Sequence, residues 1–223
     1  MPTMNKAITL LLAMMGGAPF VTWAQGQNVP PGGEQKAAMC IGCHGIPGYQ
    51  SSFPEVYKVP MISGQNPKYI VSALNAYKKG ERKHPSMRAI AVSLTDDDMA
   101  AIAAWYGGQG PGASASVKPV SQVPAPSPEV AALLTKGACV SCHGADYNKP
   151  IDASYPKLAG QHPDYLFAAL RAYATEGKAQ HGRSNAIMSA QVKQFKRDEL
   201  KAMASYLSTL PTELHTIPQP RFR

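Results

Sequence analysis

The motif C-x-x-C-H occurs twice in this chain, and it constrains the fold more than any other feature. The copies run from Cys40 to His44 and from Cys139 to His143, and together they use all the cysteines. Two thiols at this spacing can each form a thioether with a vinyl group of a haem, and the adjacent histidine can then bind the iron. The pattern therefore predicts two covalently attached haem c groups. The predicted attachment residues are Cys40, Cys43, Cys139 and Cys142, and the predicted first axial ligands are His44 and His143.

Other chemistries use similar cysteine spacings. A C-x-x-C pair can be a thioredoxin-like redox site, and four cysteines can form two disulfides or one zinc site. A redox pair does not require a histidine directly after its second cysteine, yet both pairs have one here. A four-cysteine zinc site would leave both histidines without a role. Haem attachment therefore accounts for more of the pattern than these alternatives do.

The two motifs lie within an internal repeat, which predicts two copies of one small domain. Between the copies, residues 107–128 are rich in Gly, Ser, Ala and Pro, as expected for a linker. The first domain is then predicted at 25–106 and the second at 129–223. The matching positions are Gly64-Gln65 with Gly160-Gln161, Tyr69 with Tyr165, Tyr77 with Tyr173, Arg82 with Arg183, and Met87 with Met188.

The first residues of the chain have the pattern of a secretory signal. Lys6 precedes an apolar stretch, and small residues follow it up to Ala24, so a signal peptide is predicted at 1–24. An uncleaved anchor is the alternative, although the stretch is short for a membrane span and is interrupted by glycine and proline. Export predicts a periplasmic protein, since bacterial c-type haem is attached outside the cytoplasm.

The spacing of apolar residues predicts short helices and no strands, so the fold class is all-α. Thr95 and Asp98 form a potential capping box, and Asn66 and His162 each precede a proline that can open a helix. Met99 and Met203 fall on the last helix of each copy and are expected in the core. The predicted helices begin near 34, 67, 95, 129, 163 and 197, and the first and fourth run into Cys40 and Cys139.

The second axial ligand of each haem is predicted to be a methionine. Met87 and Met188 match in the repeat, where a flexible loop could bring a thioether to the iron and raise its reduction potential. Ordinary core packing is the alternative. His84 and His181 lie near the same segments and are the rival ligands, but His84 is matched by Asn185 rather than by a histidine.

The remaining histidines, the repeated tyrosines and the paired arginines are also candidate site residues. His162 and His215 are expected to be non-ligands. The repeated tyrosines could relay electrons or simply pack against a porphyrin. Arg82 and Arg183 could pair with haem propionates or be solvated.

The chain has a formal charge of +8. Its basic residues are scattered, and an exported protein without a concentrated basic motif is not expected to bind nucleic acid. The charge serves either solubility or attraction to an acidic docking patch or an anionic membrane surface.

Taken together, the signal sequence, the paired C-x-x-C-H-G motifs, the Gly-Gln pairs and the Arg…Met pairs resemble the cytochrome c4 family. The resemblance implies two tandem class I cytochrome c domains related by a pseudo-twofold axis. It also implies the axial pairs His44/Met87 and His143/Met188. The implied role is a periplasmic electron carrier that serves a membrane-bound haem-copper terminal oxidase, with a quinol-oxidising complex or a dehydrogenase as another redox partner.

Two further functions compete with a carrier that has no substrate site. One is a dihaem enzyme, such as a thiosulfate dehydrogenase or a peroxidase, although no additional cysteine is present to act as a thiolate ligand. The other is a dihaem subunit of a dehydrogenase complex that oxidises, for example, sulfide or an alcohol.

Overall fold

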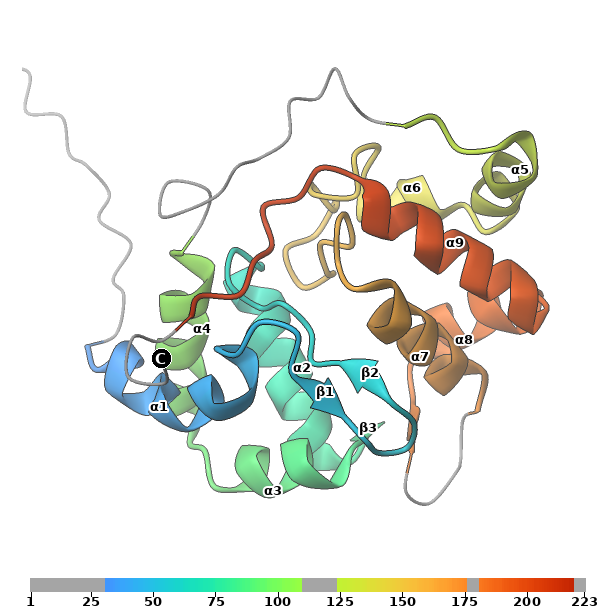
Figure 1. Ribbon diagram of the computed structural model, residues 1–223. Coiled ribbons are helices and arrows are strands. Elements are labelled where there is room, and N and C mark those ends of the chain that lie inside the picture. Colours follow the sequence, from blue (N-terminus) through green and yellow to red (C-terminus); the bar gives the residue numbers. More distant parts are fainter. Residues whose placement is uncertain (1–30, 110–123, 176–180, 219–223) are drawn as a thin grey trace, which may run out of the picture.

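The computed structural model describes residues 31–109, 124–175 and 181–218, which form two helical halves side by side (Figure 1). The predicted helical class with two tandem units is confirmed. The predicted signal peptide at 1–24 and residues 110–123 of the predicted linker lie outside the described residues. The first half contains α1 (Gly33–His44), α2 (Pro67–Lys79), α3 (Pro85–Val92) and α4 (Asp96–Gly107). The second half contains α5 (Pro128–Lys136), α6 (Cys139–His143), α7 (Pro163–Ala174), α8 (Ala186–Lys193) and α9 (Arg197–Thr209).

Within the described residues, four two-residue strands add a small amount of sheet. In the first half β1 (Gln50–Ser51) pairs antiparallel with β2 (Tyr57–Lys58). Across the junction of the halves β3 (Arg82–Lys83) pairs antiparallel with β4 (Gly182–Arg183), which places the two repeated arginines opposite each other. The sequence predicted no strand, and this prediction was wrong for these short segments. The β3–β4 pair exists only where the halves meet, so neither segment shows it in its own pattern.

Local sequence signals explain where several helices begin. α2 and α7 each start with a proline, as predicted. The capping box of α4 is confirmed: Thr95 Oγ1 accepts the Asp98 N–H at 3.1 Å, and the Asp98 carboxylate accepts the Thr95 N–H at 3.0 Å. Asn66 and His162 hold the expected cap positions, but neither side chain caps its helix.

The second half departs from the prediction at its first helix. The sequence predicted one helix from 129 into Cys139, whereas α5 ends at Lys136 and α6 begins at Cys139. Ala138 between them has a left-handed φ of 46°, which a helix cannot include. The equivalent α1 has no such break and continues to His44.

The two methionine segments are short helices rather than the flexible loops that the sequence predicted. His84 is the N-cap of α3, and its Nδ1 accepts the Met87 N–H at 3.3 Å. Asn185 is the N-cap of α8, and its Oδ1 accepts the Met188 N–H at 2.9 Å. The repeat aligned His84 with Asn185, and both side chains perform the same capping role.

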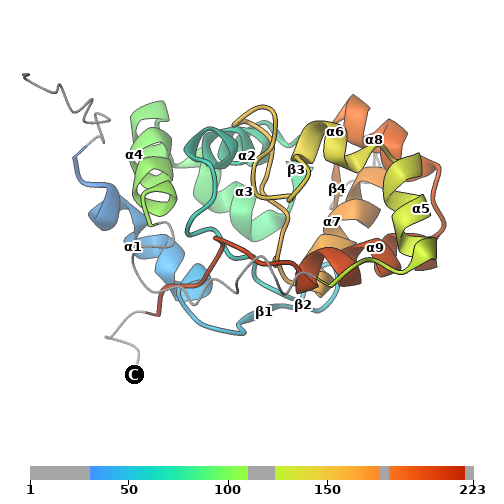
Figure 2. The ribbon, with the colours of Figure 1, turned by 90° about the horizontal axis from the view of Figure 1, so that it is seen from above.

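Each half has its own apolar core. α4 packs against α1 and α2 in the first half, and α9 packs against α5 and α7 in the second. Seen from above, α1 and α4 lie at one end of the protein and α5 lies at the other (Figure 2). Met99 is 0 % exposed and Met203 is 4 % exposed, which confirms the core positions predicted for both. The buried cores therefore flank the junction of the two halves.

The chain after α9 returns to the first half (Figure 1). The His215 N–H donates to the Ser63 carbonyl at 3.2 Å, and Lys157 Nζ forms an ion pair with Glu213. A second ion pair, between Arg171 and Glu55, crosses the junction. The halves are thus joined by polar contacts from several segments. In the part of the chain that the structure describes, no helix has both the length and the apolar character needed to cross a bilayer.

Candidate functional site

A cavity of about 700 Å³ extends through both halves, and its walls are mainly apolar. It brings together residues that are far apart in the sequence. All the candidate haem residues line it: Cys40, Cys43, His44, Met87, Cys139, Cys142, His143 and Met188. The two sets come from equivalent elements of the repeat, so each half presents an equivalent set of side chains to the cavity.

The geometry of α1 explains how its three candidate residues can act together. Positions i, i+3 and i+4 share one face of a helix, so Cys40, Cys43 and His44 are directed to one side. All the thiols are free of disulfide bonds. Burial, with a smaller effect of Cys43, raises the pKa of Cys40 to about 11. The four thiols therefore line the cavity without being joined in disulfides.

Each candidate histidine is fixed by a backbone carbonyl. His44 Nδ1 donates to the Pro60 oxygen at 2.9 Å, and His143 Nδ1 donates to the Pro156 oxygen at 3.1 Å. Because a carbonyl only accepts, the proton sits on Nδ1, and Nε2 keeps a lone pair for a metal. Burial lowers the pKa of both imidazoles and so favours this neutral form.

The candidate methionines are placed by helix starts. Met87 and Met188 are partly buried beside the two cores, and both side chains line the cavity. His84 also lines it, but its Nδ1 serves as the α3 cap, and its Nε2 lies 3.5 Å from Ser51 Oγ. His181 borders a smaller cleft instead. His162 and His215 are absent from the wall of the large cavity.

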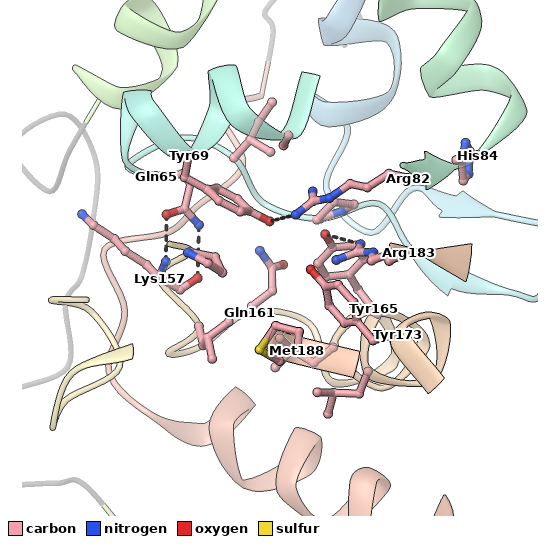
Figure 3. A pocket seen from close by; sticks show the side chains of 18 of the residues that line it. Gln65, Tyr69, Arg82, His84, Lys157, Gln161, Tyr165, Tyr173, Arg183 and Met188 are labelled. Carbon is pink, nitrogen blue, oxygen red and sulfur yellow. Dashed lines mark hydrogen bonds between the residues drawn. The ribbon is translucent and has the colours of Figure 1, made fainter. Parts of the chain in front are cut away.

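A cluster of arginines and tyrosines lies where the halves meet (Figure 3). Arg82 donates to the Tyr69 hydroxyl at 3.1 Å, and Arg183 donates to the Tyr165 hydroxyl at 3.0 Å. Each guanidinium also lies over the ring of its own tyrosine, at 5.2 Å and 5.5 Å from the centroid. Burial by itself would raise the pKa of Tyr165, but Arg183 and then Arg82 lower it. Both arginines are therefore packed against aromatic rings and are not simply solvated.

Two buried glutamines link the halves reciprocally, a role that was not predicted from the sequence. Gln65 Oε1 accepts the Lys157 N–H at 2.9 Å, and its Nε2 donates to the Lys157 carbonyl at 3.1 Å (Figure 3). Gln161 makes the same two bonds to Met61, at 3.0 Å and 2.9 Å. Since Gln65 matches Gln161 in the repeat, the two contacts have the reciprocity expected of a pseudo-twofold relation.

The chemistry of the cavity fits two haem groups. Each half supplies two free thiols, a neutral imidazole with an available Nε2, and a thioether, all on a mainly apolar wall. The zinc alternative has no comparable support. Within 31–109, 124–175 and 181–218, no three His, Cys, Asp or Glu side chains gather closely enough to hold a metal ion.

Comparison with known proteins gives the same assignment. The family model described as cytochrome c matches residues 129–211. Cytochrome c4 of Thiocapsa roseopersicina is 31% identical over 188 residues, which cover 81% of this chain and 92% of the relative. A thiosulfate dehydrogenase electron acceptor of Stutzerimonas stutzeri (strain A1501) is 30% identical over 210 residues, which cover 90% and 91%. The solved structure of Acidithiobacillus ferrooxidans cytochrome c4 is 26% identical, with a TM-score of 0.59. The match covers 78% of this chain and 99% of that chain.

Proposed function

Because this chain belongs to the cytochrome c4 family, it is an electron-transfer cytochrome with two covalently attached haem c groups. We propose that it carries electrons in the periplasm between a respiratory donor and a terminal oxidase. The observation that carries this proposal is the duplicated set of two thiols, one imidazole and one thioether on the wall of a single cavity.

Each haem is assigned to one half of the chain, with the boundaries 25–106 and 129–223. Cys40 and Cys43 would hold the first haem, and Cys139 and Cys142 would hold the second. Each iron would be bound by one histidine and one methionine, His44 with Met87 and His143 with Met188. The iron of each haem supplies a one-electron couple when the group is bound.

The residues of the chain set the reduction potential of that couple and limit access to the iron. The bonds from Nδ1 to the Pro60 and Pro156 carbonyls fix the two rings and make them more basic. A thioether on the other side favours the reduced metal and raises the potential. An imidazole and a thioether on each iron would leave a substrate no place to bind there. This arrangement supports a carrier rather than an enzyme.

The axial assignment is tested by Met87→Leu and Met188→Leu in the haem-loaded protein. Each change is expected to remove about half of the sulfur-to-iron charge-transfer band of the oxidised spectrum, because one thioether of two is lost. Each should also leave one haem that binds carbon monoxide when reduced. Met61→Leu is the matched control: Met61 lines the same cavity but has no methionine partner in the repeat. An unchanged band in both variants, or an equal loss in the control, would contradict the assignment.

The physiological partners and the location need separate experiments. A carrier for an oxidase should, when reduced, be reoxidised by membranes that contain a haem-copper oxidase, at a rate that falls with added salt. The mature protein isolated from periplasm should begin at Gln25. Recovery of the full-length chain, still membrane-bound, would favour the uncleaved anchor instead.

A second candidate is the electron-accepting subunit of a dehydrogenase complex. It is favoured by the likeness to the thiosulfate dehydrogenase electron acceptor of Stutzerimonas stutzeri. In that case the protein should co-purify with a catalytic subunit and be reduced by it directly. If it is reduced only through a quinol-oxidising complex, the first proposal stands.

A further inference from the structure

The candidate ligand His44 is connected to the opposite half through a single peptide group. The carbonyl of the Pro60–Met61 peptide accepts the His44 Nδ1–H at 2.9 Å. The N–H of the same peptide donates to Gln161 Oε1 at 3.0 Å. The peptide is therefore bonded at both ends, by a ring in the first half and by a side chain from the second.

The second half contains the same arrangement in reverse. The carbonyl of the Pro156–Lys157 peptide accepts the His143 Nδ1–H at 3.1 Å. Its N–H donates to Gln65 Oε1 at 2.9 Å, and Gln65 belongs to the first half. Each candidate ligand thus ends a short hydrogen-bond relay that starts in the other half.

The glutamine amides are held in one orientation. Gln161 Nε2 donates to the Met61 carbonyl at 2.9 Å, and Gln65 Nε2 donates to the Lys157 carbonyl at 3.1 Å. A flipped amide would place a donor against each N–H and an oxygen against each carbonyl, so only this orientation satisfies both partners. Both glutamines are only 4 % exposed. Water therefore has little access to replace these bonds.

Two general effects turn this geometry into an influence on the iron. Donation from a peptide N–H polarises the peptide and makes its carbonyl a stronger acceptor, so the bonds in a chain reinforce one another. A stronger bond from Nδ1–H to a carbonyl makes the imidazole a more basic ligand and fixes its orientation. A more basic axial ligand favours the oxidised metal, and hydrogen bonding around the ligands is one of the ways a protein sets a haem potential.

We propose that Gln65 and Gln161 are positioning residues that act crosswise: Gln161 sets the strength of His44 as a ligand, and Gln65 sets that of His143. Each half thereby tunes the reduction potential of the haem in the other. This inference rests on the axial ligands assigned above. It predicts that any event that draws the halves apart raises both potentials, because both relays cross the junction.

The test is a potentiometric titration of the haem-loaded variants Gln65→Met and Gln161→Met. Methionine keeps the approximate size of glutamine, but its sulfur is only a weak acceptor for the N–H and it has no donor for the carbonyl. Gln65→Met is expected to shift the second haem toward the reduced form by about threefold to tenfold at fixed potential and to leave the first unchanged. A tenfold shift corresponds to about 59 mV for a one-electron couple. Gln161→Met should shift the first haem toward the reduced form to a similar extent and leave the second unchanged. Met87→Leu and Met188→Leu identify which wave belongs to which haem.

The control removes a contact across the junction that touches neither relay. Glu55→Gln breaks the ion pair with Arg171 and should leave both potentials in place. A general loosening of the junction would move both waves in every variant, whereas the relay moves one wave, in the half opposite the change. The proposal is overturned if a glutamine variant shifts its own half, shifts both equally, or shifts neither. Either variant alone decides the question if the other fails to fold. A wild-type spectrum without the sulfur-to-iron band would instead refute the ligand assignment, before any glutamine is changed.

Discussion

Gly64→Ala should loosen the contact between the C-terminal segment and the first half. Gly64 has a φ of 81°, in the left-handed region that residues with a Cβ rarely adopt. A Cβ added there would lie 2.3 Å from the carbonyl oxygen of Glu213 and 3.1 Å from its carbon. That oxygen is backbone and cannot swing aside alone, so the segment around Glu213 would have to move away.

The cost can be worked out from the contacts that would be lost. The left-handed conformation costs alanine about 1–2 kcal/mol. Retreat of the segment would break the bond from the His215 N–H to the Ser63 carbonyl and disturb the bond from Lys157 Nζ to the Gly64 carbonyl. At about 1 kcal/mol for each bond, the two add about 2 kcal/mol. The expected loss of unfolding free energy is therefore about 3–4 kcal/mol.

The assay is urea unfolding of the haem-loaded protein, with Gly48→Ala as the matched control. Gly48 has a φ of 75°, but nothing lies within 4 Å of the Cβ position. Its substitution should cost only the backbone part, about 1–2 kcal/mol. The difference between the variants, about 2 kcal/mol, isolates the contact with the C-terminal segment. If Gly64→Ala is no more destabilising than Gly48→Ala, the reasoning is refuted.

Three further predictions concern stability. Met99→Ala empties a fully buried site in the first core and should cost about 2–5 kcal/mol in urea unfolding. Val92→Ala, at a side chain that is 51% exposed, should change the free energy by less than about 0.5 kcal/mol, and similar values for the two would contradict the core assignment. Ser127→Ala removes the cap of α5 and should cost about 0.5–2 kcal/mol in thermal unfolding, whereas no loss would mean that the cap is not formed in solution. The hydrogen bond from Lys36 is the main cause of the lowered pKa of Asp98. The stability linked to Asp98 is therefore present above its ordinary value of 3.8 and is lost as the pH falls below it. Asp98→Asn should flatten this acid limb in a pH series of unfolding curves, and an unchanged limb would assign it to other groups.

Much of the site could be predicted because its chemistry depends on residues that are close together in the sequence. The spacing of Cys40, Cys43 and His44 depends on the reach of neighbouring side chains, which the sequence states directly. The repeat then selected Met87 and Met188 from among the methionines, and the structure brings both to the wall of one cavity with the cysteines and histidines. The start of α4 could be predicted equally well, since a capping box involves only residues of one turn.

What the sequence missed depends on contacts between distant segments or on single backbone angles. The left-handed φ of Ala138 breaks a helix that its composition favours. The caps of α3 and α8 were present as His84 and Asn185, but a histidine is not a usual cap signal. The glutamine relays could not be predicted from one segment, because each joins a residue to a peptide in the other half. The match of Gln65 with Gln161 in the repeat is the signal that could have led to them.

The central claim is that each half holds a six-coordinate haem with one histidine and one methionine ligand. A potentiometric titration of the visible spectrum of the unmodified, haem-loaded protein tests it most directly. We expect two one-electron waves at high potential, with a sulfur-to-iron band in the oxidised form whose intensity corresponds to two thioethers. A wave at low potential, or a high-spin spectrum, would contradict the claim, since it would mean that Met87 or Met188 is not a ligand.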